Sequence, residues 1–378
     1  MGTAIVIGGG ILGTATAWRL ASYGVAVTLL EAEPTLGAGA SRASFAWLNA
    51  SNKPPKDYHQ LNVDGMNYYH RLSVELDHPR WLHFDGHVEW NGEDGGPDRI
   101  RAKVARLRDW GYTAELLPIG ELKDLEPDLV APDSIEEFAY YPQEGYINPV
   151  DMIGDFATLA MRAGVTIRTG VRVSELITEG DRITMVVTTA GERLEADVVV
   201  SATGAVSPAL LEQLGIDLVM APTTGMVAVS TPTAVRLKAV HHDDLMHIHP
   251  DGSGRIMMRH YDLDELCTPH MTEHPVPAFL DQLVERVATA LPGIAGIRIE
   301  AMRVATRPIP GDGLPMIGAI SGAEGLYLIV THSAVTMGPL LGHIAAREIV
   351  TGKRDPRLDA FRPDRAVTQV TMPSHENG

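Results

Sequence analysis

A chain of 378 residues is long enough for two domains, and 45% hydrophobic with 21% charged residues is the composition of a globular protein rather than a disordered or fibrous one. The formal net charge of −17 is spread along the chain, so neither nucleic acid nor an anionic membrane is an expected partner. The single cysteine excludes an internal disulfide framework and favours a reducing, cytoplasmic setting, and no apolar run approaches the about 20 residues that span a bilayer.

The first 31 residues have the layout of a nucleotide-binding strand, glycine turn, helix and strand. In the turn GGGILG, Gly8 permits a tight bend, Gly10 lets the backbone approach a pyrophosphate, and Gly13 lets the helix pack on the strands. Glu31 ends the second strand at about the 20-residue spacing of a ribose-binding carboxylate, which favours FAD or NAD over NADP. This stretch therefore predicts dinucleotide binding.

Residues 32–52 lack periodicity and predict a loop with a short apolar piece, which can run back beneath a cofactor. Some of its polar side chains can donate to phosphate or ring atoms, namely Ser41, Arg42 and Ser44. Other side chains can line one face of the cofactor, namely Phe45, Trp47 and Asn49. A surface loop with a buried tryptophan is an equally good interpretation. A helix is predicted next, over residues 56–76, in which His59 packs or caps rather than catalyses.

Residues 81–141 mix short strands with an arginine-rich helix at 97–110 and contain no nucleotide signature, so they are assigned to a second, inserted domain. Nucleotide-domain character resumes at Asn148, the predicted N-cap of a helix that stops at Gly164. Antiparallel strands are predicted in 171–194, and a strand buried on both faces at 197–201 ends in Ala202, Thr203 and Gly204.

Residues 218–299 again have second-domain character, with strands near 226–229, 245–249 and 255–258 and a helix that opens at Pro277. Four histidines invite comparison with a zinc site: His241, His242, His247 and His249. No acid or cysteine completes a ligand set at a familiar spacing, and strand alternation alone places two of them on one face. We therefore predict no metal site.

The last segment returns to nucleotide-domain character, with a turn-rich loop at 307–318, a buried strand at 326–330 and a helix from about Pro339 to Val350. Together these assignments divide the chain into a discontinuous FAD-type domain, residues 1–80, 145–215 and 300–370, and a substrate domain, residues 81–144 and 216–299. Residues 371–378 are predicted to be a flexible tail.

These blocks resemble the flavoprotein family of D-amino-acid oxidase, glycine oxidase and monomeric sarcosine oxidase. The N-terminal IVIGGGILG is shared by many nucleotide-binding proteins, whereas later blocks are more specific. They are GASRAS, GYINPVDMIGDFATLAMRAGVTI, ADVVVSATGAVSPALLEQLG, and TRPIPGDGLPMIG followed by GLYLIVTHSAVTMGPLLG. The resemblance implies an α/β fold with a Rossmann-like FAD-binding domain and an inserted substrate domain of mainly antiparallel β-sheet plus helices.

The resemblance also implies FAD held noncovalently, because the family's flavin-attaching cysteine is missing near 303–306 and no histidine occurs in 41–49. The loop at 332–337 would face the pyrimidine edge of the flavin, where a helix N-terminus stabilises negative charge on the reduced ring. The implied FAD-binding residues are Gly8, Gly10, Ile11, Leu12, Gly13, Glu31, Ala32, Ser41, Arg42, Ala43, Ser44, Val173, Thr203, Gly204, His332, Ser333, Ala334, Val335, Thr336 and Met337.

By the same resemblance, Arg307 would clamp the carboxylate of a small amino or imino acid, although an arginine paired with a nearby acid is the plainer alternative. His332, Tyr261 and His260 are the other residues assigned to the reaction, the last two as side chains that point into the pocket. The implied chemistry is hydride transfer from the C–N carbon to flavin N5, with the imine then hydrolysed and oxygen as acceptor.

The sequence also departs from the family pattern. Thr331 replaces the usual glycine before His332, and the strand at 255–260 has no lysine, where sarcosine oxidase has one that promotes reaction with oxygen. An amino-acid or amine dehydrogenase using a quinone or carrier is therefore a second hypothesis. A flavin-binding subunit of a larger complex and an NAD-dependent dehydrogenase are further ones. The amino acid, its stereochemistry and a homo-oligomeric state are left open.

Overall fold

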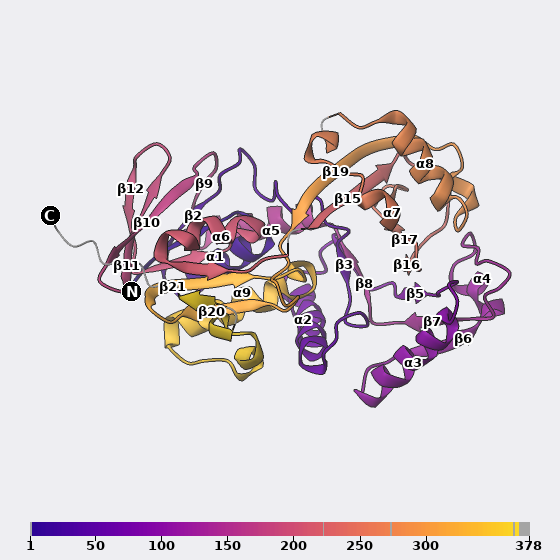
Figure 1. Ribbon diagram of the computed structural model, residues 1–378, viewed down its shortest axis with the longest axis horizontal. Coiled ribbons are helices and arrows are strands. Elements are labelled where there is room, and N and C mark those ends of the chain that lie inside the picture. The colour runs from indigo at the N-terminus through magenta and orange to yellow at the C-terminus, as the bar shows by residue number, and fades with distance from the viewer. Residues whose placement is uncertain (1, 222, 273, 366, 370–378) are drawn as a thin grey trace.

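The computed structural model describes residues 2–221, 223–272, 274–365 and 367–369. The predicted tail at 371–378 lies outside this range. Two lobes lie side by side, each built on its own large sheet, and the N-terminus belongs to the lobe on the left of Figure 1. No helix among the described residues combines the length and the apolar character needed to cross a bilayer.

The first lobe is organised around β1 (Thr3–Ile7), α1 (Ile11–Ser22) and β2 (Ala26–Leu30), as the sequence predicted. β1 pairs in parallel with β2 on one side and with β13 (Val198–Ser201) on the other. Gly8 has a φ of +106°, and a Cβ added to Gly13 would run into the Gly8 carbonyl. The turn therefore needs glycine at both positions.

The sheet of this lobe has the order β10-β11-β21-β13-β1-β2-β9, in which neighbours pair in parallel except for the β10–β11 hairpin. Asn148 caps α5 by accepting the backbone N–H groups of Val150 and Asp151, as predicted. The other elements are β9 (Thr166–Arg168), β10 (Val173–Glu179), β11 (Arg182–Thr188), β12 (Arg193–Glu195), β20 (Met316–Ile320), β21 (Ala323–Val330), α5 (Pro149–Arg162) and α6 (Ser207–Leu211).

The second lobe contains an eight-stranded, mainly antiparallel sheet of order β19-β15-β18-β17-β16-β5-β7-β6, in which only β16 and β5 pair in parallel. Its strands are β5 (His87–Glu89), β6 (Glu115–Pro118), β7 (Glu137–Tyr141), β15 (Thr223–Ser230), β16 (Val240–His242), β17 (Met246–Pro250), β18 (Ile256–His260) and β19 (Ile299–Arg307). Its helices are α3 (Gly96–Asp109), α4 (Leu122–Leu125), α7 (Tyr261–Asp264) and α8 (Pro277–Val287). We had assigned most of β19 to the nucleotide-binding part, but it pairs with β15 along its length.

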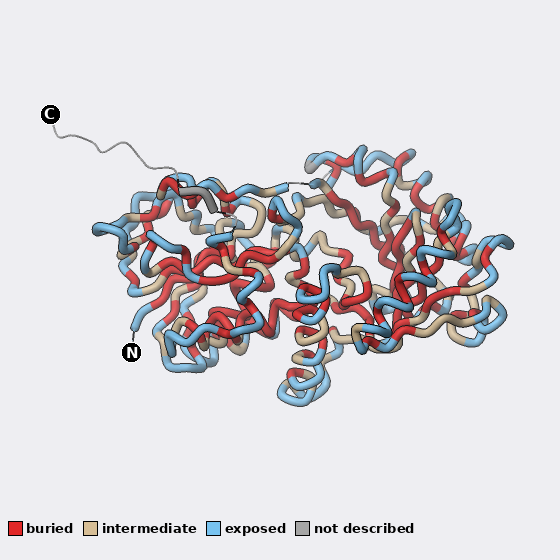
Figure 2. Tube along the Cα trace, turned by 60° about the horizontal axis from the view of Figure 1, so that its bottom comes forward, coloured by how far each residue is buried: buried red, intermediate tan, exposed pale blue. Residues whose placement is uncertain are grey.

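Three short strands lie where the lobes meet, in the order β3 (Trp47–Leu48), β8 (Gly145–Ile147) and β4 (Leu82–His83). A further pair joins β14 (Ile216–Leu218) to β22 (Val367–Gln369). α2 (Lys56–Glu75) follows β3, and its His59 bonds the Ala50 carbonyl at 2.8 Å, which fits the predicted packing role. Buried residues run through the middle of both lobes and continue across their junction (Figure 2).

The last long helix, α9 (Ala334–Thr351), begins five residues before Pro339, where we had expected it to start. A proline inside a helix lacks the N–H that would bond the carbonyl four residues earlier, which here belongs to Val335. The hydroxyl of Tyr69 on α2 donates to that carbonyl at 2.6 Å. Because a distant side chain satisfies this carbonyl, the helix extends back toward His332 and its N-terminus reaches the junction of the lobes.

Candidate active site

Two cavities open along the junction of the lobes. The first, of about 380 Å³, lies over the glycine turn, the loop after β2 and the carboxyl end of β13. The second, of about 860 Å³, lies between the loop that contains residues 40–53 and the antiparallel sheet of the second lobe. Because their walls share six residues, the cavities meet end to end: Ala40, Ser44, Ala305, Pro308, His332 and Val335.

Most of the residues predicted to bind the cofactor line one of these cavities. Those on the first are Gly8, Gly10, Ile11, Leu12, Glu31, Ala32, Ser41, Ser44, Val173, Thr203, Gly204, His332, Ala334 and Val335. Ala43, Ser333 and Thr336 line the second instead. Gly13 and Met337 are buried in the packing behind, and Arg42 lies on a separate cavity with Asn148 and Arg303.

Side-chain hydrogen bonds hold the glycine turn in place on the wall of the first cavity. Glu31 accepts the Gly9 N–H at 2.6 Å through one oxygen and the Glu33 N–H at 2.8 Å through the other. Ser41 Oγ accepts the Ile11 N–H at 3.2 Å. The carboxylate expected to contact a ribose thus also fixes the turn, and the start of α1 faces the cavity as an anion site would.

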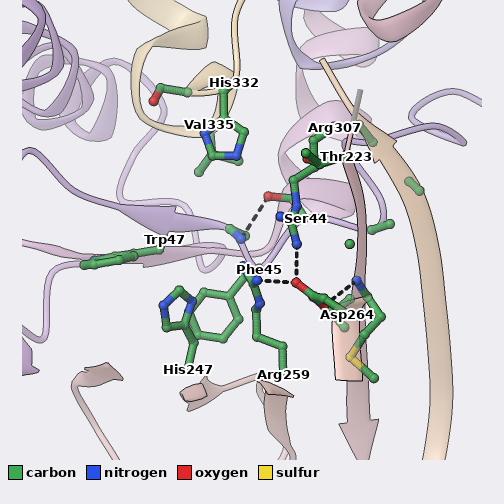
Figure 3. A pocket seen from close by; sticks show the side chains of 18 of the residues that line it. Ser44, Phe45, Trp47, Thr223, His247, Arg259, Asp264, Arg307, His332 and Val335 are labelled. Atoms are coloured by element: carbon green, nitrogen blue, oxygen red, sulfur yellow. Dashed lines mark hydrogen bonds and ion pairs between the residues drawn. The ribbon is translucent and has the colours of Figure 1, made fainter. Parts of the chain in front are cut away.

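A cluster of three charged side chains lies on the wall of the second cavity (Figure 3). Arg259 of β18 and Arg307 of β19 both form ion pairs with one oxygen of Asp264, and the other oxygen accepts the Met226 N–H at 3.1 Å. Arg307 is therefore paired with an acid, which was the alternative to its role as a substrate clamp. Two guanidinium groups nevertheless share a single carboxylate, so the cluster keeps one net positive charge.

Beside this cluster, Tyr261 links two histidines on the cavity wall. Its hydroxyl lies 2.5 Å from His247 Nε2 and 3.1 Å from His242 Nε2. Burial raises the pKa of Tyr261 to about 12 and holds the pKa of His247 well below its usual range. At neutral pH this part of the wall consequently carries an uncharged phenol and an uncharged imidazole.

His260 does not line the cavity, contrary to the expectation that it points into the pocket with Tyr261. It is buried, and its Nδ1 lies 3.3 Å from Nη1 of Arg286 on α8. Successive strand residues face opposite sides of a sheet, so Arg259 on the cavity side leaves His260 on the α8 side. Tyr261 reaches the cavity because the strand ends at His260 and α7 begins.

His332 lines both cavities beside the N-terminus of α9, and Lys53 lines the second cavity close enough to act on the charge of His332. The exposed surface of His332 faces the cavity, and the surrounding protein together with the charge of Lys53 lowers its pKa to about 3. Burial lowers the pKa of Lys53 to about 8. Sequence patterns gave no signal for Lys53, because it follows the irregular stretch at 32–52 and no motif surrounds it.

The family model for FAD dependent oxidoreductases of the DAO type matches residues 3–348. The chain belongs to this family. Glycine oxidase from Bacillus licheniformis is 25% identical over 370 residues, which cover 96% of each chain. A D-amino acid dehydrogenase from Vibrio vulnificus (strain CMCP6) is 24% identical, covering 95% of this chain and 99% of the relative. The crystal structure of glycine oxidase from Geobacillus kaustophilus superposes with a TM-score of 0.86 at 23% identity. The match covers 97% of this chain and 99% of the glycine oxidase chain.

As a DAO-family oxidoreductase the protein uses FAD, and the joined cavities fit this cofactor. A Cβ at Gly10 would lie 3.0 Å from Ser41 Oγ, so the glycine keeps the backbone at the cavity floor accessible. Glu31 and the start of α1 would hold the adenosine and pyrophosphate part, while the N-terminus of α9 faces the junction where the flavin ring would lie. The NAD-dependent alternative is excluded by the family assignment.

Proposed function

We propose that this DAO-family protein oxidises the C–N bond of a small α-amino or imino acid, with oxygen as the electron acceptor. Support comes from the family assignment and from relatives whose names include glycine oxidase and D-amino acid dehydrogenase. The observation that carries the substrate class is the cluster of Arg259, Asp264 and Arg307, which keeps one positive charge on the cavity wall.

A carboxylate that enters the second cavity would neutralise the surplus charge of this cluster. Guanidinium groups suit carboxylates because their N–H donors form a planar fork, and partial exclusion of water strengthens the interaction. Gly225 on β15 supports this role, since any side chain there would occupy the space of the Arg307 guanidinium. We therefore assign Arg307 to the substrate carboxylate, with Asp264 and Arg259 holding it in place.

The opposite end of the cavity suits the reacting carbon and amine. FAD, when bound, takes up two electrons from the substrate, and the protein's part is to orient the C–N bond toward the cavity junction. His247, Tyr261 and His332 add no charge of their own there at neutral pH, which leaves Lys53 as the neighbouring cation. Burial and this nearby positive charge both disfavour a protonated amine, so they favour the neutral amine from which electrons are withdrawn.

Lys53 favours oxygen over a carrier as the acceptor. Oxygen becomes negatively charged as it accepts electrons, so a cation on the cavity wall stabilises that step. The strand at 255–260 offers no lysine, but Lys53 reaches the same cavity from the loop before α2. This arrangement supports oxidase activity despite the missing strand lysine.

Substitution Lys53→Met should slow peroxide formation at least about 10-fold while electron transfer to a dye changes little. Because Lys53 is charged below its pKa of about 8, the wild-type oxygen reaction should weaken as the pH rises through 8, and the variant should lack this step. Stopped-flow reoxidation of reduced enzyme at pH 6 to 10 measures both. Equal losses with oxygen and dye would contradict the assignment.

The proposed activity is tested by anaerobic titration of the purified flavoprotein with D-, L- and N-methyl amino acids and the matching decarboxylated amines. We expect the flavin absorption to bleach with one class of amino acid and not with its decarboxylated counterpart. Peroxide formation in air then separates an oxidase from a dehydrogenase. Flavin that no amino acid bleaches would instead support a cofactor-binding subunit that requires a partner.

A further inference from the structure

Three potential metal ligands converge behind the cavity wall. His87 and Glu89 lie two residues apart on β5, and His242 lies on β16, which pairs in parallel with β5 so that His242 is opposite Glu89. β5 and β16 lie next to each other in Figure 1. One ligand atom from each of the three residues lies within 4.8 Å of the others. The histidines at 241–249 alone indicated no ligand set in the sequence, because two of these ligands come from β5.

Among the described residues, one imidazole nitrogen of this set has no partner and another is paired only with the carboxylate of the set. His87 is fully buried, and its Nε2 makes no hydrogen bond. His242 Nδ1 lies 3.2 Å from Glu89 Oε1 but is not directed at it as a hydrogen-bond donor. Buried polar atoms without partners are rare and call for a group that satisfies them.

The proton assignments leave lone pairs facing one another. The 2.5 Å distance from Tyr261 assigns the phenolic proton to His247, so that His242 Nε2 donates to the tyrosine oxygen and its Nδ1 carries no proton. In the same way, His87 donates through Nδ1 to Glu144 at 2.9 Å and keeps a lone pair on Nε2. With Glu89 Oε1, this assignment leaves a lone pair on each member of a set whose ligand atoms lie within 4.8 Å of one another.

The far side of each ligand is already held, as it is in metal sites. His87 is oriented by Glu144, which also accepts the backbone N–H groups of Ala50 and Ser51. Glu89 uses its other oxygen to accept from Lys103 at 2.5 Å and from Tyr141 at 2.9 Å. A carboxylate behind a ligating histidine is the usual outer arrangement of zinc sites, since it fixes the tautomer and the ring direction.

We infer that His87, Glu89 and His242 bind a divalent transition-metal ion, for which two imidazoles and one carboxylate favour Zn²⁺. Tetrahedral zinc with ligands at about 2.1 Å separates them by roughly 3.4 Å. His242 Nδ1 and Glu89 Oε1 already lie 3.2 Å apart, and the three ligand atoms all lie within 4.8 Å of one another. His242 also lines the second cavity, the side from which a fourth ligand such as water would reach the ion. The ion would thereby fix Tyr261 through His242, independently of which amino acid is oxidised.

The test uses the FAD-loaded enzyme and zinc alone. Chelator-treated protein is incubated with ZnCl₂, desalted and analysed for zinc, flavin and thermal unfolding. We expect about one zinc per chain and a higher Tm for wild type, and loss of both effects in His242→Gln and His87→Gln. Flavin content and circular dichroism show whether each variant is folded.

The matched control removes the exposed pair His270 and His274, whose rings lie 4.6 Å apart and could bind zinc on the surface. The double variant H270A/H274A should keep the full zinc content. Wild-type protein without bound zinc would overturn the inference, and so would zinc that is lost in the double variant but retained in H242Q. If H242Q does not fold, the inference is judged by the zinc content of wild type and of H87Q.

Discussion

Gly13→Ala should destroy flavin binding and destabilise the protein by about 3 kcal/mol or more. The added Cβ would lie far closer than 3.0 Å to the Gly8 carbonyl oxygen, which belongs to backbone and cannot rotate away as a side chain could. Either α1 moves off the sheet or the glycine turn opens, and each movement displaces the N–H groups that face the cavity. Flavin content after desalting and urea unfolding measure the two effects.

Gly154→Ala is the matched control. Gly154 lies on the exposed face of α5, where a Cβ would meet nothing within 4 Å. Because glycine is a poor helix former, this variant should retain its flavin and gain up to about 1 kcal/mol. A Gly13→Ala variant that binds flavin as well as Gly154→Ala does would contradict the role given to the turn.

Arg307→Met should raise the KM for the substrate about 100-fold and leave the flavin content unchanged. The substitution removes the donor assigned to the substrate carboxylate, and a charge-assisted hydrogen bond contributes roughly 1.5–3 kcal/mol. The remaining Arg259–Asp264 pair is neutral, so this cluster also loses its net positive charge. Steady-state kinetics with the amino acid found in the titration measure the effect.

Arg303→Met separates loss of this interaction from general damage to β19. Arg303 lies on the same strand but lines a different cavity and donates to the Arg42 carbonyl at 3.3 Å. Its KM should stay within about two-fold of wild type. A KM that is unchanged in Arg307→Met, or raised equally in both variants, would remove the carboxylate assignment.

Features encoded within short stretches of sequence were predictable. The strand, glycine turn and helix over the first 31 residues depend on local periodicity and on glycine positions that accept no other residue. Asn148 identified the start of α5 in the same way, because a cap acts within a few residues. Conversely, the start of α9 was placed too late, since Tyr69 compensates for Pro339 from another helix.

The sequence by itself determined the FAD-binding unit, the existence of an inserted antiparallel sheet and the family. Only the tertiary structure decided the composition of the active site: Asp264 shared by two arginines, Lys53 on the wall of the second cavity, and His87 and Glu89 beside His242. The physical reason is the separation along the chain of the residues that interact. Periodicity and capping are set by neighbours along the chain, whereas strand pairing brings together charges and imidazoles that are far apart in sequence.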